Sequence, residues 1–130
     1  MQVGSPFLRR VLALDAVASG ATGLLLAAGA GPLAPLLGLP EPLMRPAGVF
    51  LIGYAVVIGV MSRRYELPKI AVNMVVALNA LWAIESLAIL ALGWVQPTAL
   101  GYAFVVFQAV VVGVFAELQF IAVRRTTRVA

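Results

Sequence analysis

The chain has 130 residues, of which 63% are hydrophobic and 11% are charged, and its formal net charge is +4. A soluble domain carries about a quarter charged residues, so this composition excludes an ordinary soluble protein. Cys and His are absent, which excludes disulfides, iron–sulfur clusters, histidine-ligated haem, zinc sites built on these residues and histidine-based catalysis. We therefore expect a single membrane domain over 1–130 that is not an enzyme and has no metal site or resident cofactor.

Four apolar segments, taken in chain order, predict membrane-spanning helices. They cover about 11–30, 47–62, 70–93 and 99–123, and each is near the roughly 20 residues that a helix needs to cross about 30 Å of hydrocarbon. Backbone exposed to lipid must be hydrogen-bonded internally, so helices are the expected structure. The sequence predicts an all-α membrane protein, a bundle of four transmembrane helices joined by short loops.

The loops contain residues that end helices. Between the first two predicted helices the chain carries seven such residues: Gly31, Pro32, Pro35, Gly38, Pro40, Pro42 and Pro46. The apolar stretch 33–39 in this loop is expected to lie in the membrane interface, and the sequence leaves open whether it is helical. Pro68 is expected to begin the third helix and Pro97 the fourth, because a missing N–H costs least at a helix start.

Basic residues predict how the chain is threaded. Eight of the nine lie on one side of the predicted bundle: Arg9, Arg10, Arg63, Arg64, Lys69, Arg124, Arg125 and Arg128. Arg45 is on the other side, so the positive-inside rule places both termini in the cytoplasm. Basic clusters at helix ends are typical of contact with anionic lipid headgroups, and no basic face for nucleic acid is present.

The N-terminal segment has one alternative interpretation. Arg9 and Arg10, the apolar stretch that follows and the small residues at 27–30 resemble a secretory signal peptide. Asp15 interrupts the apolar core that such a peptide needs, so we expect an uncleaved first helix.

Small residues at helical spacing predict where helices pack closely. The second predicted helix carries Gly48, Ala55 and Gly59 along one stripe, and the first carries Gly20 and Gly23. Small side chains let a neighbouring helix backbone approach, so these positions are expected to be helix-packing surfaces.

Polar residues within the apolar segments form the candidate site, because each needs a partner or a purpose in lipid. At about 1.5 Å rise per residue, Asp15, Asn73, Glu117 and Gln119 fall in the cytoplasmic third. We expect Asp15 and Glu117 to pair with nearby Arg or Lys or to meet water there.

A second group falls near the midplane and comprises Asn79, Gln108 and either Ser19 or Thr22. Asn79 and Gln108 are expected to make hydrogen bonds between helices. On the third helix Asn79, Trp82, Glu85 and Ser86 share one face.

Glu85 is the candidate that the sequence singles out most sharply. It is expected in the outer half, at the level of Tyr54, with no basic side chain near its depth except Arg45. Proton coupling, cation binding or a hydrogen bond to a headgroup or pigment would each use such a carboxyl group. The structural alternative is a protonated Glu85 bonded to Tyr54, Thr22 or Ser86.

Several short motifs carry a family resemblance. They are Leu-Asp15-Ala, Leu36-Leu-Gly-Leu-Pro40, Asn79-Ala-Leu-Trp82, the stretch Gly-Trp-Val-Gln-Pro-Thr-Ala-Leu-Gly at 93–101, Phe107-Gln108-Ala and Ala116-Glu117-Leu-Gln119. With these motifs the chain resembles a group of small four-helix inner-membrane proteins of proteobacteria with no assigned activity, and more loosely DoxX-like proteins. The resemblance implies a multi-pass protein of the bacterial inner membrane and supplies no catalytic residues.

Three functions remain open. The first expectation is an accessory or structural subunit of a larger membrane complex, respiratory or photosynthetic, whose partners are lipids and other membrane subunits or further copies of itself. The second is a homo-oligomeric small transporter or channel with Glu85 as the coupling carboxylate. The third is a lipid- or quinone-binding protein, and lipid, quinone or pigment are the groups that such a chain would hold.

Overall fold

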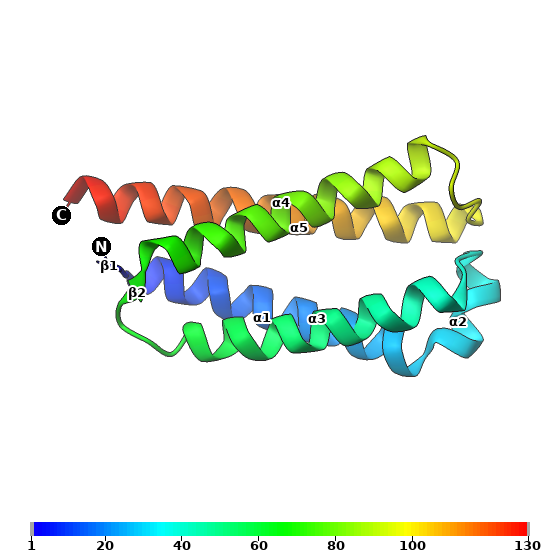
Figure 1. Ribbon diagram of the computed structural model, residues 1–130, viewed down its shortest axis with the longest axis horizontal. Coiled ribbons are helices and arrows are strands. Elements are labelled where there is room, and N and C mark those ends of the chain that lie inside the picture. Colours follow the sequence, from blue (N-terminus) through cyan, green and yellow to red (C-terminus); the bar gives the residue numbers. More distant parts are fainter. Residues whose placement is uncertain (1, 130) are drawn as a thin grey trace.

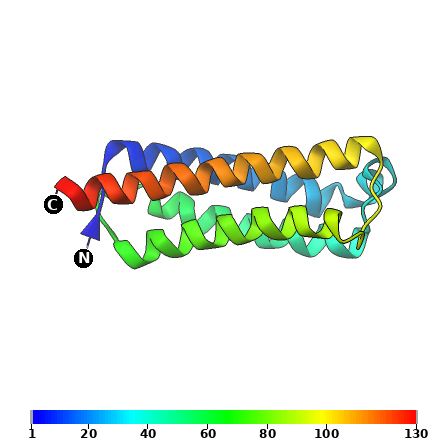
Figure 2. The same cartoon turned by 90° about the horizontal axis from the view of Figure 1, so that it is seen from above.

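The computed structural model describes the backbone of residues 2–129 and the side chains of residues 2–125. Its five helices and two short strands run in the order β1 Gln2–Val3, α1 Pro6–Ala28, α2 Ala30–Leu37, α3 Glu41–Met61, β2 Leu67–Pro68, α4 Lys69–Ala91 and α5 Ala99–Val129. The four long helices lie along one axis as two antiparallel hairpins, α1 with α3 and α4 with α5 (Figure 1). Figures 1 and 2 show both chain ends at one end of the bundle, the terminal end, and α2 at the other, the distal end.

Local chemistry explains where the helices begin and end. The Ser5 side chain accepts a hydrogen bond from the Leu8 N–H (3.0 Å), and Pro6 starts α1 where its missing donor costs little. Gly38 closes α2 with a φ of 68°, the left-handed conformation that glycine adopts without strain. At the start of α5 the Thr98 hydroxyl accepts a hydrogen bond from the Gly101 N–H (3.1 Å) and donates one to the Leu36 carbonyl (2.8 Å). Thr98 therefore ties α5 to α2.

Two apolar cores hold the hairpins together, one at each end. The terminal core consists of Val3, Leu8, Leu12, Ile58, Leu67, Val72, Val75, Ala122 and Val123. The distal core consists of Leu26, Ala30, Leu37, Leu39, Met44, Leu51, Val95 and Val105. Strand β1 pairs antiparallel with β2, which fixes the N-terminal segment to the turn between α3 and α4. The hairpins are therefore joined by apolar packing at both ends, and the region between these cores holds the polar residues.

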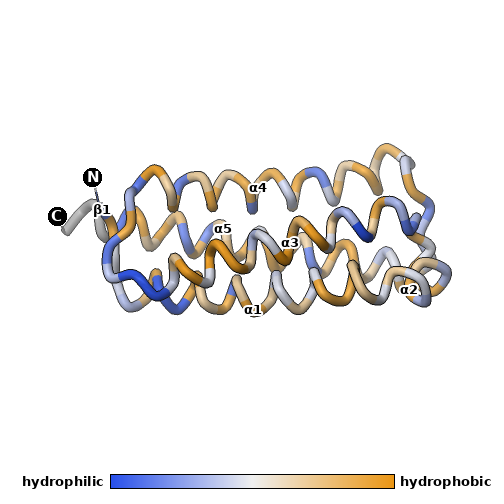
Figure 3. Tube along the Cα trace, turned by 60° about the horizontal axis from the view of Figure 1, so that its bottom comes forward, coloured by the Kyte–Doolittle hydropathy of each residue, from blue (hydrophilic) through white to orange (hydrophobic). Residues whose placement is uncertain are grey.

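The chain has the form of a multi-pass membrane protein. Among the described residues, α1, α3, α4 and Ala99–Arg125 of α5 are each long and apolar enough to span a bilayer. Figure 3 shows hydrophobic residues along the middle of these helices and a hydrophilic stretch in the turn between α3 and α4. The expected all-α bundle of four spanning helices is confirmed.

Some boundaries differ from those expected. The first helix begins at Pro6 rather than near 11, because Ser5 caps it and proline is tolerated in the first turn. The second begins at Glu41 rather than near 47, because Pro42 lies in its first turn, where proline is tolerated. Residues 33–37 of the apolar stretch in the first loop are helical and belong to α2.

Candidate functional site

The centre of the bundle holds a polar cluster to which all four long helices contribute. It consists of Asp15 and Ser19 from α1, Tyr54 from α3, Asn79 from α4 and Gln119 from α5. Asp15 and Gln119 are fully buried, and Ser19 and Asn79 are nearly so. Buried polar groups are costly unless they are hydrogen-bonded, and among the described residues no buried side-chain N or O atom lacks a partner.

Asp15 is the hub of this cluster. Its Oδ1 lies 2.9 Å from the Ser19 hydroxyl, and its Oδ2 lies 2.8 Å from the Tyr54 hydroxyl, 3.1 Å from Asn79 Nδ2 and 2.8 Å from Gln119 Nε2. Asn79 Nδ2 also donates to Gln119 Oε1 (2.8 Å). All these partners are uncharged, so the carboxyl group is held by hydrogen bonds from every long helix rather than by a cation.

The expected pairing of Asp15 with Arg, Lys or interfacial water is wrong. In the part of the chain with described side chains, the ion pair found is that of Arg45 with Glu41. Asp15 lies nine residues into α1, about 14 Å from its first residue. This distance places Asp15 beyond the basic residues of the terminal end and at one level with Asn79, Tyr54 and Gln119.

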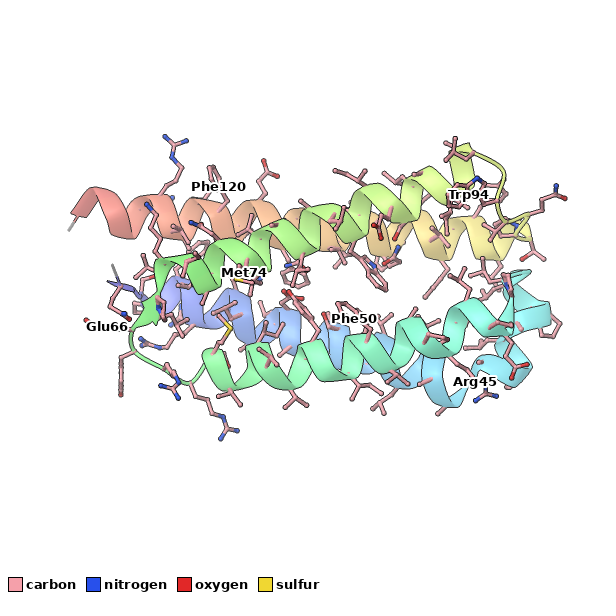
Figure 4. The ribbon with its side chains drawn as sticks, in the orientation of Figure 1. Arg45, Phe50, Glu66, Met74, Trp94 and Phe120 are labelled. Atoms are coloured by element: carbon pink, nitrogen blue, oxygen red, sulfur yellow. The ribbon has the colours of Figure 1, made fainter. Side chains whose placement is uncertain are left out.

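A second polar contact lies on the distal side of the cluster. Trp82 Nε1 donates to Gln108 Oε1 (2.8 Å), and Gln108 Nε2 donates to the Val105 carbonyl (2.9 Å). The Trp82 ring stacks on Phe50 at a centroid distance of 5.8 Å and an interplanar angle of 8°. Figure 4 shows Phe50 on the side of α3 that faces α4. Trp82 therefore links α4 to α5 through its indole nitrogen and to α3 through its ring.

Two apolar chambers adjoin the Trp82–Gln108 pair. The lateral chamber, about 340 Å³, is lined mainly from α1 and α5, by Asp15, Ala18, Ser19, Ala21, Thr22, Leu51, Trp82, Phe104, Phe107, Gln108, Val111, Val112 and Phe115. The distal chamber, about 190 Å³, is lined by Leu26, Leu39, Leu43, Met44, Ala47, Trp82, Glu85, Ser86, Ile89, Phe104, Val105 and Gln108. Trp82, Phe104 and Gln108 line both, so these three residues form the wall between the chambers.

Glu85 lies in the lining of the distal chamber with an exposed side chain. Among the described residues it has no hydrogen bond and no ion pair. The expected alternative, a bond to Tyr54, Thr22 or Ser86, is not formed, because Tyr54 contacts Asp15 and Ser86 donates to the Trp82 carbonyl (2.7 Å). Tyr54 also lies at the level of Asp15 rather than of Glu85.

Arg45 does not reach Glu85. Its guanidinium binds the Glu41 carboxylate one turn earlier on α3 and donates to the Ala27 carbonyl of α1 (3.1 Å). Figure 4 shows it at the distal end, on the side of α3 away from α4. In the part of the chain with described side chains, Glu85 therefore forms no ion pair with a cation.

The other candidates are spread over the surface and the chambers. Asn73 and Glu117 are exposed and lie outside the polar cluster. Thr22 is half-buried in the lateral chamber, and among the described side chains its hydroxyl has no hydrogen-bond partner. The structure thus brings together five of the candidates, Asp15 and its four partners, and leaves Asn73, Glu117 and Glu85 apart.

The small residues singled out in the sequence lie between α1 and α3. A Cβ added at Gly23 would lie 2.8 Å from the Gly48 carbonyl oxygen, and one at Gly48 would overlap the backbone nitrogen of Ala27. Gly20 faces Ala55, and Gly59 faces Ala16. The backbones of α1 and α3 are therefore in direct contact at Gly23 and Gly48.

Sequence reasoning missed the gathering of Asp15, Tyr54, Asn79 and Gln119 at one level. The contact of Ser19 with Asp15 could have been predicted, because Ser19 lies one turn after Asp15 on the same helix. The relative depth of residues on different helices depends on where each helix begins and how it tilts, and no pattern within one segment records that.

Comparisons with family models, with curated proteins and with solved structures found no match to this chain. Among the described residues, no three carboxylates gather in a way that would hold a metal ion. The case for a function therefore depends on the geometry of the cluster and the two chambers.

Proposed function

We propose that this chain binds one lipophilic molecule, taken from the bilayer, between its two hairpins. This is the third of the functions considered from the sequence, and the lateral chamber is the observation that carries it. Small-molecule sites are typically concave, about 300–1,000 Å³ in volume, and mostly apolar with a few polar groups. The lateral chamber has a volume of about 340 Å³ and a lining of this kind.

The position of the chamber favours a ligand that enters from the side. Phe107 lines it and is 71% exposed, and Ala21 in the same lining is also exposed. In a chain that spans a bilayer, this rim faces the lipid chains. A molecule dissolved in the bilayer would therefore reach the chamber without crossing water.

Polar groups in the lining favour a small uncharged head on that molecule. The Thr22 hydroxyl has no hydrogen-bond partner among the described residues, and Gln108 Nε2 has a second hydrogen beyond the one given to Val105. Both are donors for a carbonyl or hydroxyl oxygen. Among the described side chains, no Lys or Arg lines the chamber, so an anionic headgroup would be buried without a counter-charge, which is costly.

The distribution of basic residues favours one orientation of the bundle in a bacterial inner membrane. Both chain ends and the basic turn between α3 and α4 lie at the terminal end, whereas Arg45 is at the distal end (Figures 1 and 4). The positive-inside rule then favours a cytoplasmic terminal end in a bacterial inner membrane. Lipids of that membrane are the first source of ligand to test.

The test is native mass spectrometry of the full chain extracted in a mild detergent, followed by chemical identification of any bound molecule. We expect one lipophile per chain in the wild type. Ala18→Phe fills the lateral chamber and should remove most of the bound molecule. Ala77→Phe makes the same change on the exposed face of α4, outside both chambers, and should retain it.

Thr22→Val refines this test, because it removes the hydroxyl and keeps the shape. We expect reduced occupancy, with the same molecule bound. Equal loading of Ala18→Phe and Ala77→Phe would contradict the proposal. Recovery of the chain in fixed ratio with other membrane subunits and with an empty chamber would support the accessory role instead.

A further inference from the structure

The Tyr54 hydroxyl lies between two other oxygen atoms. Its Oη is 2.8 Å from Asp15 Oδ2 and 2.9 Å from Asn79 Oδ1. Both separations are hydrogen-bond distances, and each such bond needs one hydrogen between the oxygens. A tyrosine hydroxyl carries one hydrogen, and an amide oxygen carries none. Of the two groups beside the Tyr54 hydroxyl, Asp15 is the one that can carry a second hydrogen.

Reversing the side-chain amides does not remove this requirement. In the structure Asn79 Nδ2 donates to Asp15 Oδ2 and to Gln119 Oε1, and Asn79 Oδ1 therefore faces Tyr54. Turning one amide alone places like atoms of Asn79 and Gln119 against each other. Turning both places two amide oxygens against Asp15 Oδ2, so a hydrogen on that carboxyl group is needed again.

We propose that Asp15 is a proton-binding site and that its proton stabilises the contact of Tyr54 on α3 with Asn79 on α4. We call the line of contact between these two helices their seam. In the protonated state Asp15 Oδ2 donates to Tyr54 Oη, and Tyr54 donates to Asn79 Oδ1. Ser19 donates to Asp15 Oδ1, while Asn79 Nδ2 and Gln119 Nε2 donate to Oδ2. Every polar atom of the cluster then has a partner of the correct kind. This site does not depend on what the chambers hold.

Among the described residues, the side chains that contact Asp15 are all uncharged. The titratable group that contacts it is Tyr54 of α3, and the contacts from α4 and α5 are the amides of Asn79 and Gln119. On α1 its partner is Ser19. No cation among the described residues would stabilise the carboxylate form, whose burial is costly.

Loss of the proton would mainly weaken the contact between Tyr54 Oη and Asn79 Oδ1. The Tyr54 hydrogen would turn to the Asp15 carboxylate, and Tyr54 Oη and Asn79 Oδ1 would face each other with no hydrogen between them. Asp15 loses one proton and no other covalent bond changes, while the hydrogen bond donated by Tyr54 moves from Asn79 to Asp15. Besides this contact, α3 and α4 are linked midway by the stack of Phe50 on Trp82, so this seam is the one that loosens. Asp15 also lies in the lining of the lateral chamber.

Infrared difference spectroscopy in lipid nanodiscs tests where the proton is. At neutral pH the wild type should show the C=O stretching band of a protonated carboxyl group, and Asp15→Asn should lose it. Tyr54→Phe removes the acceptor of the carboxyl hydrogen and should shift the band to higher wavenumber. Glu85→Gln, matched in chemistry but outside the cluster, should leave it unchanged. A spectrum of Asp15→Asn identical to that of the wild type would overturn the proposal.

Spin-label distances test what the proton does, and the absence of Cys in the chain allows clean labelling. Val49→Cys on α3 and Ile84→Cys on α4 are exposed and lie the same number of residues beyond Tyr54 and Asn79 toward the distal end. We expect a narrow distance distribution at low pH that becomes broader and longer at high pH. With Asp15→Asn as well, the distribution should not respond to pH. A pH-independent wild type, or an equal response in both, would overturn the proposal.

Discussion

Helix α3 packs against α1 and against α4 through different kinds of contact. Against α1, Gly23 and Gly48 bring the two backbones into contact. Against α4, no comparable close approach of the backbones occurs, and the link midway is made by side chains, the Tyr54–Asn79 contact and the Phe50–Trp82 stack. The first seam lies within a hairpin, and the second lies between the two hairpins.

This difference separates what is permanent in the bundle from what can change. Close backbone packing depends on shape alone, so neither a proton nor a ligand alters it. A seam of hydrogen-bonded side chains responds to both, because its strength depends on where hydrogens lie. Both chambers reach into the space between the hairpins, and the buried carboxyl group of Asp15 lies there too. The function should therefore belong to the seam between the hairpins.

The largest effect is expected from Asp15→Ala, which removes the hub of the seam between the hairpins. It leaves Ser19, Asn79 and Gln119 each with a donor that lacks its acceptor, and unsatisfied buried groups cost about 1–3 kcal/mol each. We expect a loss of about 3 kcal/mol or more in the free energy of unfolding, measured in mixed detergent micelles. Asp15→Asn keeps the size and one acceptor, so its loss should be about 1 kcal/mol. Equal losses would show that the hydrogen bonds matter less than the filled volume.

Gly48→Ala tests the seam within the hairpin. The added Cβ would overlap the backbone of Ala27, so α1 and α3 must move apart, at about 1–3 kcal/mol. Gly53→Ala is the matched control on the same helix, since a Cβ there meets nothing within 4 Å. It should be neutral or stabilising by up to about 1 kcal/mol through helix propensity. A tolerated Gly48→Ala would mean that this seam, too, can adjust.

Much of the fold could be predicted from the sequence, for physical reasons. The four apolar segments, the proline-rich breaks and the stripe of small residues each depend on chain-local properties. Helix starts were less predictable because they depend on caps. The first helix was expected to begin near residue 11, after Arg9 and Arg10, yet Ser5 and Pro6 begin α1 ahead of them. That shift of about one turn moved Asp15 from the expected interface to the buried centre.

The candidate site could be predicted as a set of residues but not as an arrangement. Asn79 and Gln108 were expected to bond between helices, and the structure gives their partners as Asp15, Tyr54 and Gln119 for the first and Trp82 for the second. Glu85, the most prominent candidate in the sequence, has no polar partner among the described residues. The sequence placed no basic residue other than Arg45 at the depth of Glu85, and in the structure no described basic side chain pairs with it.

Two glutamines of α5 allow the cluster between the hairpins to be compared with a bond inside one hairpin. Gln119→Leu removes a donor to Asp15 and an acceptor for Asn79, and should cost about 1–2 kcal/mol. Gln108→Leu removes the acceptor for Trp82, at about 0.6 kcal/mol, an average value for hydrogen bonds between membrane helices. The same micelle unfolding assay measures both. A larger loss for Gln108→Leu would mean that the Trp82–Gln108 bond within the α4–α5 hairpin contributes more to stability than the Asp15 cluster between the hairpins.

The smallest effect is expected from Glu85→Gln. Its side chain is exposed at the distal chamber and has no hydrogen bond or ion pair among the described residues, so the free energy of unfolding should change by less than about 0.5 kcal/mol. Ligand occupancy of the lateral chamber should also be unchanged, because Glu85 does not line it. Loss of a bound molecule or of ion flux in this variant, with stability intact, would restore Glu85 as a coupling carboxylate. That outcome would shift the functional part of the seam from the buried proton of Asp15 to the open distal chamber.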